Sequence, residues 1–441
     1  MVEIQIPEKV NKIIHTLQEH GYEAYAVGGC VRDSFLGRKP MDWDITTSAM
    51  PEETKALFPH TFDTGIEHGT ITVLLDHEGF EVTTYRVDGK YEDSRHPKEV
   101  IFVRNLQEDL LRRDFTINAM AYNEKEGLVD IFGGMDDLRA GIIRCVGNAQ
   151  ARFSEDALRI LRGIRFAAQL GFELEDETRE GMRLLAPTLR KISAERIQVE
   201  LVKTLTSSRP DLLREAWKLG ITKEFLPEFD LAMETTQETV HHMYTVGEHI
   251  LHTLLEVRAD RILRLTMLLH DIGKPYMKTM DADGVAHFKG HPEKSSELAN
   301  EILHRLKFDN DTIRKVTKLV RYHDHRMPVT PTHVRRAIHE IGEDLFPLYL
   351  EVRRADVSAQ SMYQREEKVA DINGVEKLYH EIMERNECVS LKMLAVTGKD
   401  LIAAGMKPGK EIGQMLEHFL DLVLEHPELN QKEELLKRIE L

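Results

Sequence analysis

The sequence has 441 residues, which is enough for about three domains of ordinary size. Its 41% apolar and 30% charged residues are typical of globular proteins, and no run of about eighteen apolar residues predicts a transmembrane helix. The net charge of −16 counts against a nucleic-acid partner, although a local basic stripe can still bind phosphates on an acidic protein. Three scattered cysteines exclude a disulfide framework or a zinc knot. Since the first residues also lack a signal-peptide pattern, we expect a cytoplasmic protein.

A helix, a short strand and a glycine turn open the chain. Apolar residues recur at helical spacing between residues 7 and 20, which predicts an amphipathic helix. Residues 25–27 read as the end of a buried strand, after which Gly28 and Gly29 lead into a helical turn over residues 30–36. Glycine lets backbone N–H groups approach a phosphate closely at a helix start, so this turn is a candidate phosphate cradle.

A second strand, expected over residues 43–46, carries two aspartates. Asp42 and Asp44 are two positions apart, so on an extended strand their side chains project to the same face. Two such carboxylates require a cation, and their oxygen atoms suit Mg²⁺. A Gly-Gly pair alone is usually a turn, and an Asp-x-Asp alone is usually a solvated strand end. Together they predict phosphoryl or nucleotidyl transfer.

The pattern Gly-Gly-x-x-Arg-Asp-x-x-x-Gly-x-x-x-x-Asp-x-Asp over residues 28–44 resembles the signature of the tRNA nucleotidyltransferase and poly(A) polymerase family. In that family the two aspartates hold catalytic Mg²⁺. The resemblance implies this role for Asp42 and Asp44, and it implies that Gly29 and Arg32 position the triphosphate of a nucleotide.

Two β-rich runs, 71–75 and 80–87, are separated by turn residues and predict a hairpin. Glu81 shares a strand face with Thr83 and is a candidate third carboxylate of the metal site, while a plain charged strand residue explains it equally well. Residues 88–97 are polar and aperiodic, which predicts a mobile loop. They resemble the family's flexible loop, which enzymes able to add a terminal A retain.

An arginine-rich segment over residues 110–119 precedes the neck of the family. Paired N–H donors of arginine can hold a triphosphate. By resemblance, Arg113 contacts the nucleotide and Asn118 lies near its sugar.

A second arginine-rich stretch offers a way to select nucleotides. From periodicity alone, Asp156, Arg159, Arg162 and Arg165 form one helix face, and a solvated face is the default interpretation. Cytosine and adenine, however, each place an exocyclic amine beside an unprotonated ring nitrogen, which matches a carboxylate and a nearby arginine. Uracil and guanine would leave buried partners unpaired, at about 1–3 kcal/mol per group. The resemblance implies that Asp156 and Arg159 read the base and that Arg162 and Arg165 bind the nucleotide.

Histidines and aspartates form a second constellation in the C-terminal half. An apolar helix over residues 263–269 leads into His-Asp-x-Gly-Lys, and imidazole with carboxylate suits a divalent metal that could activate water. This resembles the HD phosphohydrolase domain, with a metal-free relic as the alternative. His242 lies seven residues before His249 and could replace it. The match falls on His249, His270, Asp271 and Asp356, with His291 and His323 as candidate ligands of a second metal.

The expected fold class is α+β in four parts. A nucleotidyltransferase head with a mixed β-sheet covers residues 1–150, a base-recognising helical neck 151–207, and an all-α body with the HD domain 208–375. A helical tail over 376–441 resembles the family's tail, which contacts the tRNA elbow, and its lysines offer phosphate contacts.

The sequence therefore predicts template-independent addition of CCA to the 3′ end of tRNA. The 3′-hydroxyl would attack the α-phosphate of CTP or ATP and release pyrophosphate, with two Mg²⁺ about 3.5–4 Å apart held by Asp42 and Asp44. The HD site is a candidate phosphatase or phosphodiesterase site with its own divalent metal. Alternatives are an A-adding tRNA nucleotidyltransferase or a poly(A) polymerase, and, from another class, an HD phosphohydrolase with a nucleotide-sensing head. No membrane partner is expected, and the oligomeric state is not predicted.

Overall fold

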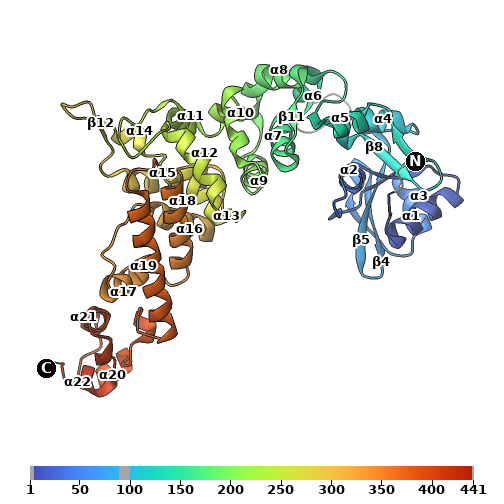
Figure 1. Cartoon of the computed structure of the whole chain (residues 1–441). Helices are drawn as coiled ribbons and strands as arrows, with labels where there is room; N and C mark the ends of the chain where they lie inside the picture. Colours follow the sequence, from blue (N-terminus) through green and yellow to red (C-terminus); the bar gives the residue numbers. More distant parts are fainter. Residues whose placement is uncertain (1–3, 89–99, 440–441) are drawn as a thin grey trace. The chain divides into compact units, whose positions relative to one another are not determined.

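The computed structural model describes residues 4–88 and 100–439 (Figure 1). The chain forms two compact units, Met1–Pro227 and Glu228–Leu441. Nearly all of the loop predicted over residues 88–97 lies outside the described residues. Among the helices of the described ranges, none is both long and apolar enough to cross a membrane.

A seven-stranded mixed sheet forms the centre of the head, with strand order β3-β4-β5-β2-β1-β8-β9. Only β2 and β5 pair in parallel among these neighbours, and the other pairs are antiparallel. The predicted α+β class is confirmed. The strands are β1 (Ala24–Val27), β2 (Ile45–Thr47), β3 (Thr61–Gly65), β4 (Thr70–Leu75), β5 (Glu78–Thr84), β8 (Met120–Asn123) and β9 (Gly127–Asp130).

Local sequence explains the elements around the sheet. Helix α1 (Glu8–Glu19) buries its apolar stripe, as its periodicity predicts. The predicted β4–β5 hairpin is confirmed, and its turn residues Asp76 and His77 have φ of 49° and 65°. Positive φ at both central residues is the requirement of the turn that matches the twist of a hairpin.

The strand expected over residues 43–46 begins only at Ile45, so both aspartates precede it. The last residue pair between β1 and β2 is Ala26 with Ile45. Strand β1 then ends at Val27, and the backbone turns at Gly28 (φ 83°) into helix α2 (Gly29–Phe35). The Val27 N–H of β1 still donates to the Asp44 carbonyl at 3.0 Å, so the backbone of Asp44 is fixed beside β1 although it precedes β2.

The neck is helical, but the helix expected through residues 155–165 is interrupted. Helix α6 (Ala149–Glu155) ends before Asp156, whose backbone is extended, and α7 (Leu158–Leu170) begins two residues later. The Asp156 carboxylate accepts the Leu158 N–H, two residues further on, at 3.0 Å, a local turn that competes with a continuous helix. The neck continues with α8 (Asp176–Leu185) and α9 (Ala194–Leu205), and α7 packs against α9.

The second unit is built from helices apart from the short pair β12 (Thr279–Met280) and β13 (Ala286–His287). Helix α12 (Val246–Glu256) packs against α13 (Arg261–Leu269) and α18 (Phe346–Ser358), and α13 packs against α16 (Asn310–Tyr322). Helices α15 (His291–Arg305) and α19 (Arg365–Glu384) also belong to this part, as do the shorter helices α11 (Pro227–Glu234), α14 (Lys274–Met277) and α17 (Pro331–Ile341). Helices α20 (Gly398–Ala403) and α21 (Lys410–Glu425) share a small core in the tail around Leu401 and Phe419.

Candidate active sites

A cavity of about 440 Å³ lies where β1, α2 and the neck helices of the first unit meet. It brings together seven of the residues predicted from sequence to bind nucleotide or metal, although these come from segments far apart in the chain. Its lining is Gly28, Gly29, Arg32, Asp44, Arg112, Arg113, Asp114, Asn118, Asp156, Leu158, Arg159, Arg162, Phe166 and Arg196.

The carboxylate pair stands at the edge of this cavity. Asp42 and Asp44 are both exposed, and Asp44 is part of the cavity wall. Crowding of the Asp44 carboxylate by surrounding protein raises its pKa, the charge of Asp42 raises it further, and Arg113 opposes both. A divalent cation between the aspartates would relieve this repulsion, so the pair fits the predicted Mg²⁺.

Glu81 lies on the strand next to the aspartates. Strands β2 and β5 pair in parallel with Ile45 opposite Val82, so Asp44 and Glu81 occupy corresponding positions one residue earlier. The Glu81 side chain is exposed. Its role as a third carboxylate stays a prediction.

Arginines beside the glycine turn could bind the triphosphate. A Cβ on Gly28 would come within 3.2 Å of Arg113 Nη1 and would also be strained at this residue's positive φ. Arg32 donates to Asn118 Oδ1 at 2.6 Å and pairs with Asp33 at 2.8 Å. No hydrogen-bond partner faces the buried Arg113 Nε within residues 4–88 and 100–439, which leaves a donor for an anionic ligand.

Asp114 also lines the cavity and contacts both Arg162 and Asn118. Sequence reasoning did not assign it a site role. It binds Arg162 at 2.6 Å and accepts an N–H from Asn118 at 3.1 Å. Although burial opposes ionisation, Arg162 and the Asn118 hydrogen bond lower the Asp114 pKa to about 2. An acid directly after two arginines was the available signal.

The two base-reading candidates line the cavity but hold other partners. Asp156 pairs with Arg196 at 2.8 Å, whereas Arg159 pairs with Glu155 at 2.6 Å and donates to the Arg112 carbonyl at 3.0 Å. The expectation that they are helix neighbours is wrong, because Asp156 precedes α7. Both nevertheless line the same cavity, together with Arg196, which sequence reasoning missed.

Arg165 is placed differently from the other predicted arginines. It is buried, pairs with Glu200 at 2.6 Å, and does not belong to the cavity lining. Its predicted contact with the nucleotide stays a prediction. In this structure the Arg165 side chain lies behind the residues that line the cavity.

Four histidines in the second unit converge through the same ring atom. In each ring Nδ1 lies within hydrogen-bond distance of a backbone carbonyl and is placed to donate to it, so that the Nε2 lone pair is free for a metal. The Nδ1–O distances are 3.4 Å for His249, 2.7 Å for His270, 2.9 Å for His291 and 2.6 Å for His323.

Asp271 lies between two pairs of these imidazoles. Its Oδ2 is 3.6 Å from His249 Nε2 and 3.4 Å from His270 Nε2, and its Oδ1 is 3.4 Å from both His291 Nε2 and His323 Nε2. Lys274 forms an ion pair with Oδ2 at 2.7 Å.

Asp356 completes the first of these groups. Its Oδ1 lies 2.9 Å from His249 Nε2, and Gln360 donates to its Oδ2 at 3.0 Å. Burial opposes the charge of both carboxylates, yet Lys274 and His270 hold the pKa of Asp271 well below its usual range, and His249 and His270 do the same for Asp356. His249, rather than His242, belongs to the group that could hold a metal, and the His242 Nε2 lies against Lys274 Nζ at 3.4 Å.

These donor atoms fit divalent metal ions. The Nε2 atoms of His291 and His323 are 3.2 Å apart, and two unprotonated nitrogens at that separation repel each other unless a cation lies between them. The donors form two groups that share Asp271, namely His249–His270–Asp271 and Asp271–His291–His323. A carboxylate with one oxygen in each group is suited to bridge two metals.

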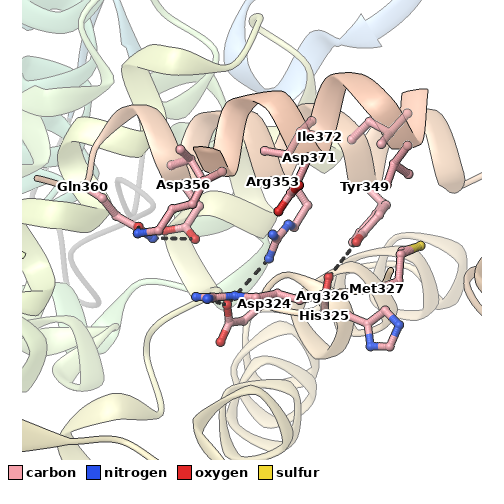
Figure 2. Close-up of a pocket in the computed structure, with 14 residues that line it drawn as sticks. Asp324, His325, Arg326, Met327, Tyr349, Arg353, Asp356, Gln360, Asp371 and Ile372 are labelled. Carbon is pink, nitrogen blue, oxygen red and sulfur yellow. Dashed lines mark hydrogen bonds and ion pairs between the residues drawn. The ribbon is translucent and has the colours of Figure 1, made fainter. Parts of the chain in front are cut away.

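A cavity of about 440 Å³ beside Asp271 and Asp356 has four cationic side chains in its lining. Lys274, Lys289, Arg326 and Lys368 all contribute to it. Figure 2 shows a smaller neighbouring pocket that shares Asp356, Gln360 and Arg326 with this cavity. In that view Arg353 faces Asp324, with 3.6 Å between the charged atoms, and Gln360 contacts Asp356.

Family comparisons cover most of the chain. Residues 24–144 match a poly(A) polymerase head domain, residues 171–233 a probable RNA- and SrmB-binding site of polymerase A, and residues 287–439 a putative second domain of tRNA nucleotidyltransferase. The CCA-adding enzyme of Limosilactobacillus reuteri is 34% identical over 445 residues, which covers 98% of this chain and 96% of the relative. The CCA-adding enzyme of Leuconostoc mesenteroides is 50% identical over 302 residues, which covers 66% of this chain and 74% of the relative.

Solved structures agree. The Bacillus stearothermophilus CCA-adding enzyme in complex with CTP superposes with a TM-score of 0.70 at 29% identity, covering 96% of this chain and 94% of that one. The Thermotoga maritima CCA-adding enzyme complexed with tRNA shares the fold, with a TM-score of 0.61 at 22% identity over 99% of this chain and 97% of that one.

Proposed function

The chain belongs to the family of CCA-adding enzymes, and on that premise we propose that it adds C, C and A to the 3′ end of tRNA from CTP and ATP without a template. One observation carries the proposal. A single cavity joins the carboxylate Asp44, the arginines Arg32 and Arg113, and the base-reading candidates Asp156 and Arg159.

The residues of the cavity divide the work by position. Asp42 and Asp44, with Glu81 as the third carboxylate, would hold Mg²⁺, which when bound neutralises charge on the phosphates and favours the ionised 3′-hydroxyl. Gly29, Arg32, Arg113 and Arg162 bind and orient the triphosphate, and Arg165 supports them from behind the wall. Asp156 accepts from the exocyclic amine of C or A, and Arg159 donates to the adjacent ring nitrogen.

The alternatives are less favoured. An A-adding enzyme and a poly(A) polymerase would need the same head, but full-length relatives are named CCA-adding enzymes. A head that only senses nucleotides would not need the carboxylate pair at the edge of the cavity. The proposal divides the chain into head (1–150), neck (151–207), body (208–375) and tRNA-binding tail (376–441), and it places the protein in the cytoplasm with its substrates.

Separate supply of the two nucleotides tests this activity. Three tRNAs, one without CCA, one ending in C and one ending in CC, are incubated with labelled CTP or ATP alone. With CTP alone, the proposal predicts two added C on the tRNA without CCA, one on the tRNA ending in C, and none on the tRNA ending in CC. With ATP alone, it predicts one added A on the CC-ended tRNA and none on the other two. Incorporation of A alone, with CTP inert on every end, would instead identify an A-adding enzyme.

A second function is favoured by the converging histidines. We propose that the HD site binds divalent metal through His249, His270, Asp271 and Asp356, with a second ion on His291 and His323. Such a centre activates water for attack on a phosphate ester, and the cationic lining of the cavity suits an anionic substrate of this kind. Terminal or cyclic phosphates on damaged tRNA ends are the substrates we propose.

Metal-supplemented hydrolysis assays test the second function. The full chain is incubated with oligonucleotides bearing a 3′-phosphate or a 2′,3′-cyclic phosphate in Mn²⁺, Co²⁺ or Ni²⁺, beside the variant Asp356→Asn. Phosphate ester cleavage by the wild type that the variant lacks supports the assignment. Inertness in all three metals would refute it without touching the nucleotidyltransferase proposal.

A further inference from the structure

One aromatic ring in the nucleotide cavity is surrounded by arginines. The ring of Phe166, on α7, lies beneath the guanidinium carbons of Arg32, Arg162 and Arg165 at 5.1, 5.4 and 3.9 Å from its centroid. Phe166 belongs to the cavity lining, as do Arg32 and Arg162. The head supplies Arg32 and the neck supplies Arg162, so the ring joins two arginines that no local sequence motif connects.

Each of these arginines also holds an acid. Arg32 pairs with Asp33 at 2.8 Å, Arg162 with Asp114 at 2.6 Å, and Arg165 with Glu200 at 2.6 Å. A carboxylate occupies N–H groups at the edge of the planar guanidinium. The π-face of a phenyl ring attracts the cation without using any N–H group, so the donors that the acid leaves free stay available to a ligand.

The position of the ring is itself determined by packing. Phe166 is 5% exposed and meets the edge of Phe115, with 5.8 Å between ring centroids and 79° between planes. A Cβ on Gly163, one turn earlier on α7, would reach within 3.0 Å of Phe115 Cζ and 2.1 Å of Met182 Cε. The glycine therefore allows Phe115 to pack closely against α7 beside Phe166.

We propose that Phe166 is a positioning residue for the triphosphate, and that its ring face holds Arg32 and Arg162 at the spacing that the phosphates require. This inference rests on the proposed function for the identity of the ligand. Because Phe166 acts on phosphate-binding groups and not on Asp156, loss of the ring weakens the binding of CTP and of ATP by the same factor. It leaves the preference for C and A over U and G unchanged.

Two substitutions distinguish the effect of the aromatic π-face of Phe166 from the effect of its side-chain volume. Phe166→Leu retains an apolar side chain without a π-face, and Phe166→Tyr retains the face. Phe153→Leu is the matched control, because Phe153 is fully buried in α6 and lies outside the cavity lining. The readouts are CTP and ATP affinity by equilibrium titration, KM and kcat for incorporation, and Tm to verify folding.

The proposal predicts an affinity about tenfold lower for both nucleotides in F166L, with kcat changed much less, and recovery in F166Y. F153L keeps wild-type affinity. Wild-type affinity in F166L, a defect for one nucleotide only, or an F166Y variant as weak as F166L would each overturn the proposal. Affinity is measured without turnover, so a failure to incorporate nucleotides would count against the proposed function alone.

Discussion

Replacing Asp156 by asparagine tests base selection directly. The carboxylate is held on the cavity wall by Arg196 at 2.8 Å, and its oxygens can only accept hydrogen bonds while it is ionised. The amide of Asp156→Asn has nearly the same shape but carries two donors. When these face the exocyclic amine of cytosine or adenine, two donors oppose each other. When the amide NH₂ instead faces O4 of uracil or O6 of guanine, it can donate to that oxygen, so one of the two mismatches with Asp156 and Arg159 is relieved.

The size of the effect follows from one lost hydrogen bond to a charged partner in a partly buried site. One unsatisfied group costs about 1–3 kcal/mol, so kcat/KM for CTP and ATP should fall by about 5- to 150-fold. Arg196 also loses an ion pair whose side chains are 25% and 18% exposed, which lowers stability by about 1 kcal/mol at most. The protein should therefore remain folded.

Single-turnover incorporation of each of the four nucleotides onto tRNA lacking CCA measures the preference for C and A over U and G. Asp136→Asn is the control, since the Asp136 side chain is 87% exposed and lies outside the cavity lining. The expected result is reduced C and A incorporation, raised U and G incorporation, and no change in the control. If D156N keeps the wild-type ranking of the four nucleotides, Asp156 does not read the base.

Other predictions concern metal ligands and pH. Asp42→Asn should abolish nucleotide incorporation while tRNA binding persists in a filter assay; appreciable incorporation would refute the metal role. Asp271→Asn should lower bound Mn²⁺, measured by mass spectrometry of the dialysed protein, while CCA addition continues at the wild-type rate; unchanged metal content would contradict the bridging role. The pKa of Asp114 is lowered from the ordinary 3.8 to about 2, so its ionised form stabilises the folded state at pH values above 3.8. This contribution to the free energy of unfolding disappears as the pH falls towards 2. The stability gap between wild type and Asp114→Asn in urea should therefore narrow by about 2 kcal/mol over that range, and a constant gap would disprove it.

Local patterns explain why much of the fold was predictable. The amphipathic helix α1, the strand before Gly28 and the β4–β5 hairpin each depend on residues close in sequence. The burial of His270 and Asp271 was equally predictable, since both follow an apolar helix that must be buried, while their role as metal ligands stays a prediction.

Features that depend on packing between distant segments were not predictable. The Asp156–Arg196 pair spans 40 positions, and α7 must pack on α9 to form it. From the sequence alone, Phe166 looks like an ordinary core residue, because its contact with Arg32 of the head forms only in the folded structure. The break before α7 was missed for another reason, because an aspartate can continue a helix or turn the backbone with its own side chain, and only the structure shows which.

The most direct measurement is the mass of tRNA after reaction with CTP and ATP together in excess. Starting from tRNA that lacks CCA, the account predicts a single product heavier by two cytidylates and one adenylate, with no further extension at long times. A ladder of added A residues, or addition that stops after the second C, would contradict the claim that one cavity reads both nucleotides and completes the CCA end.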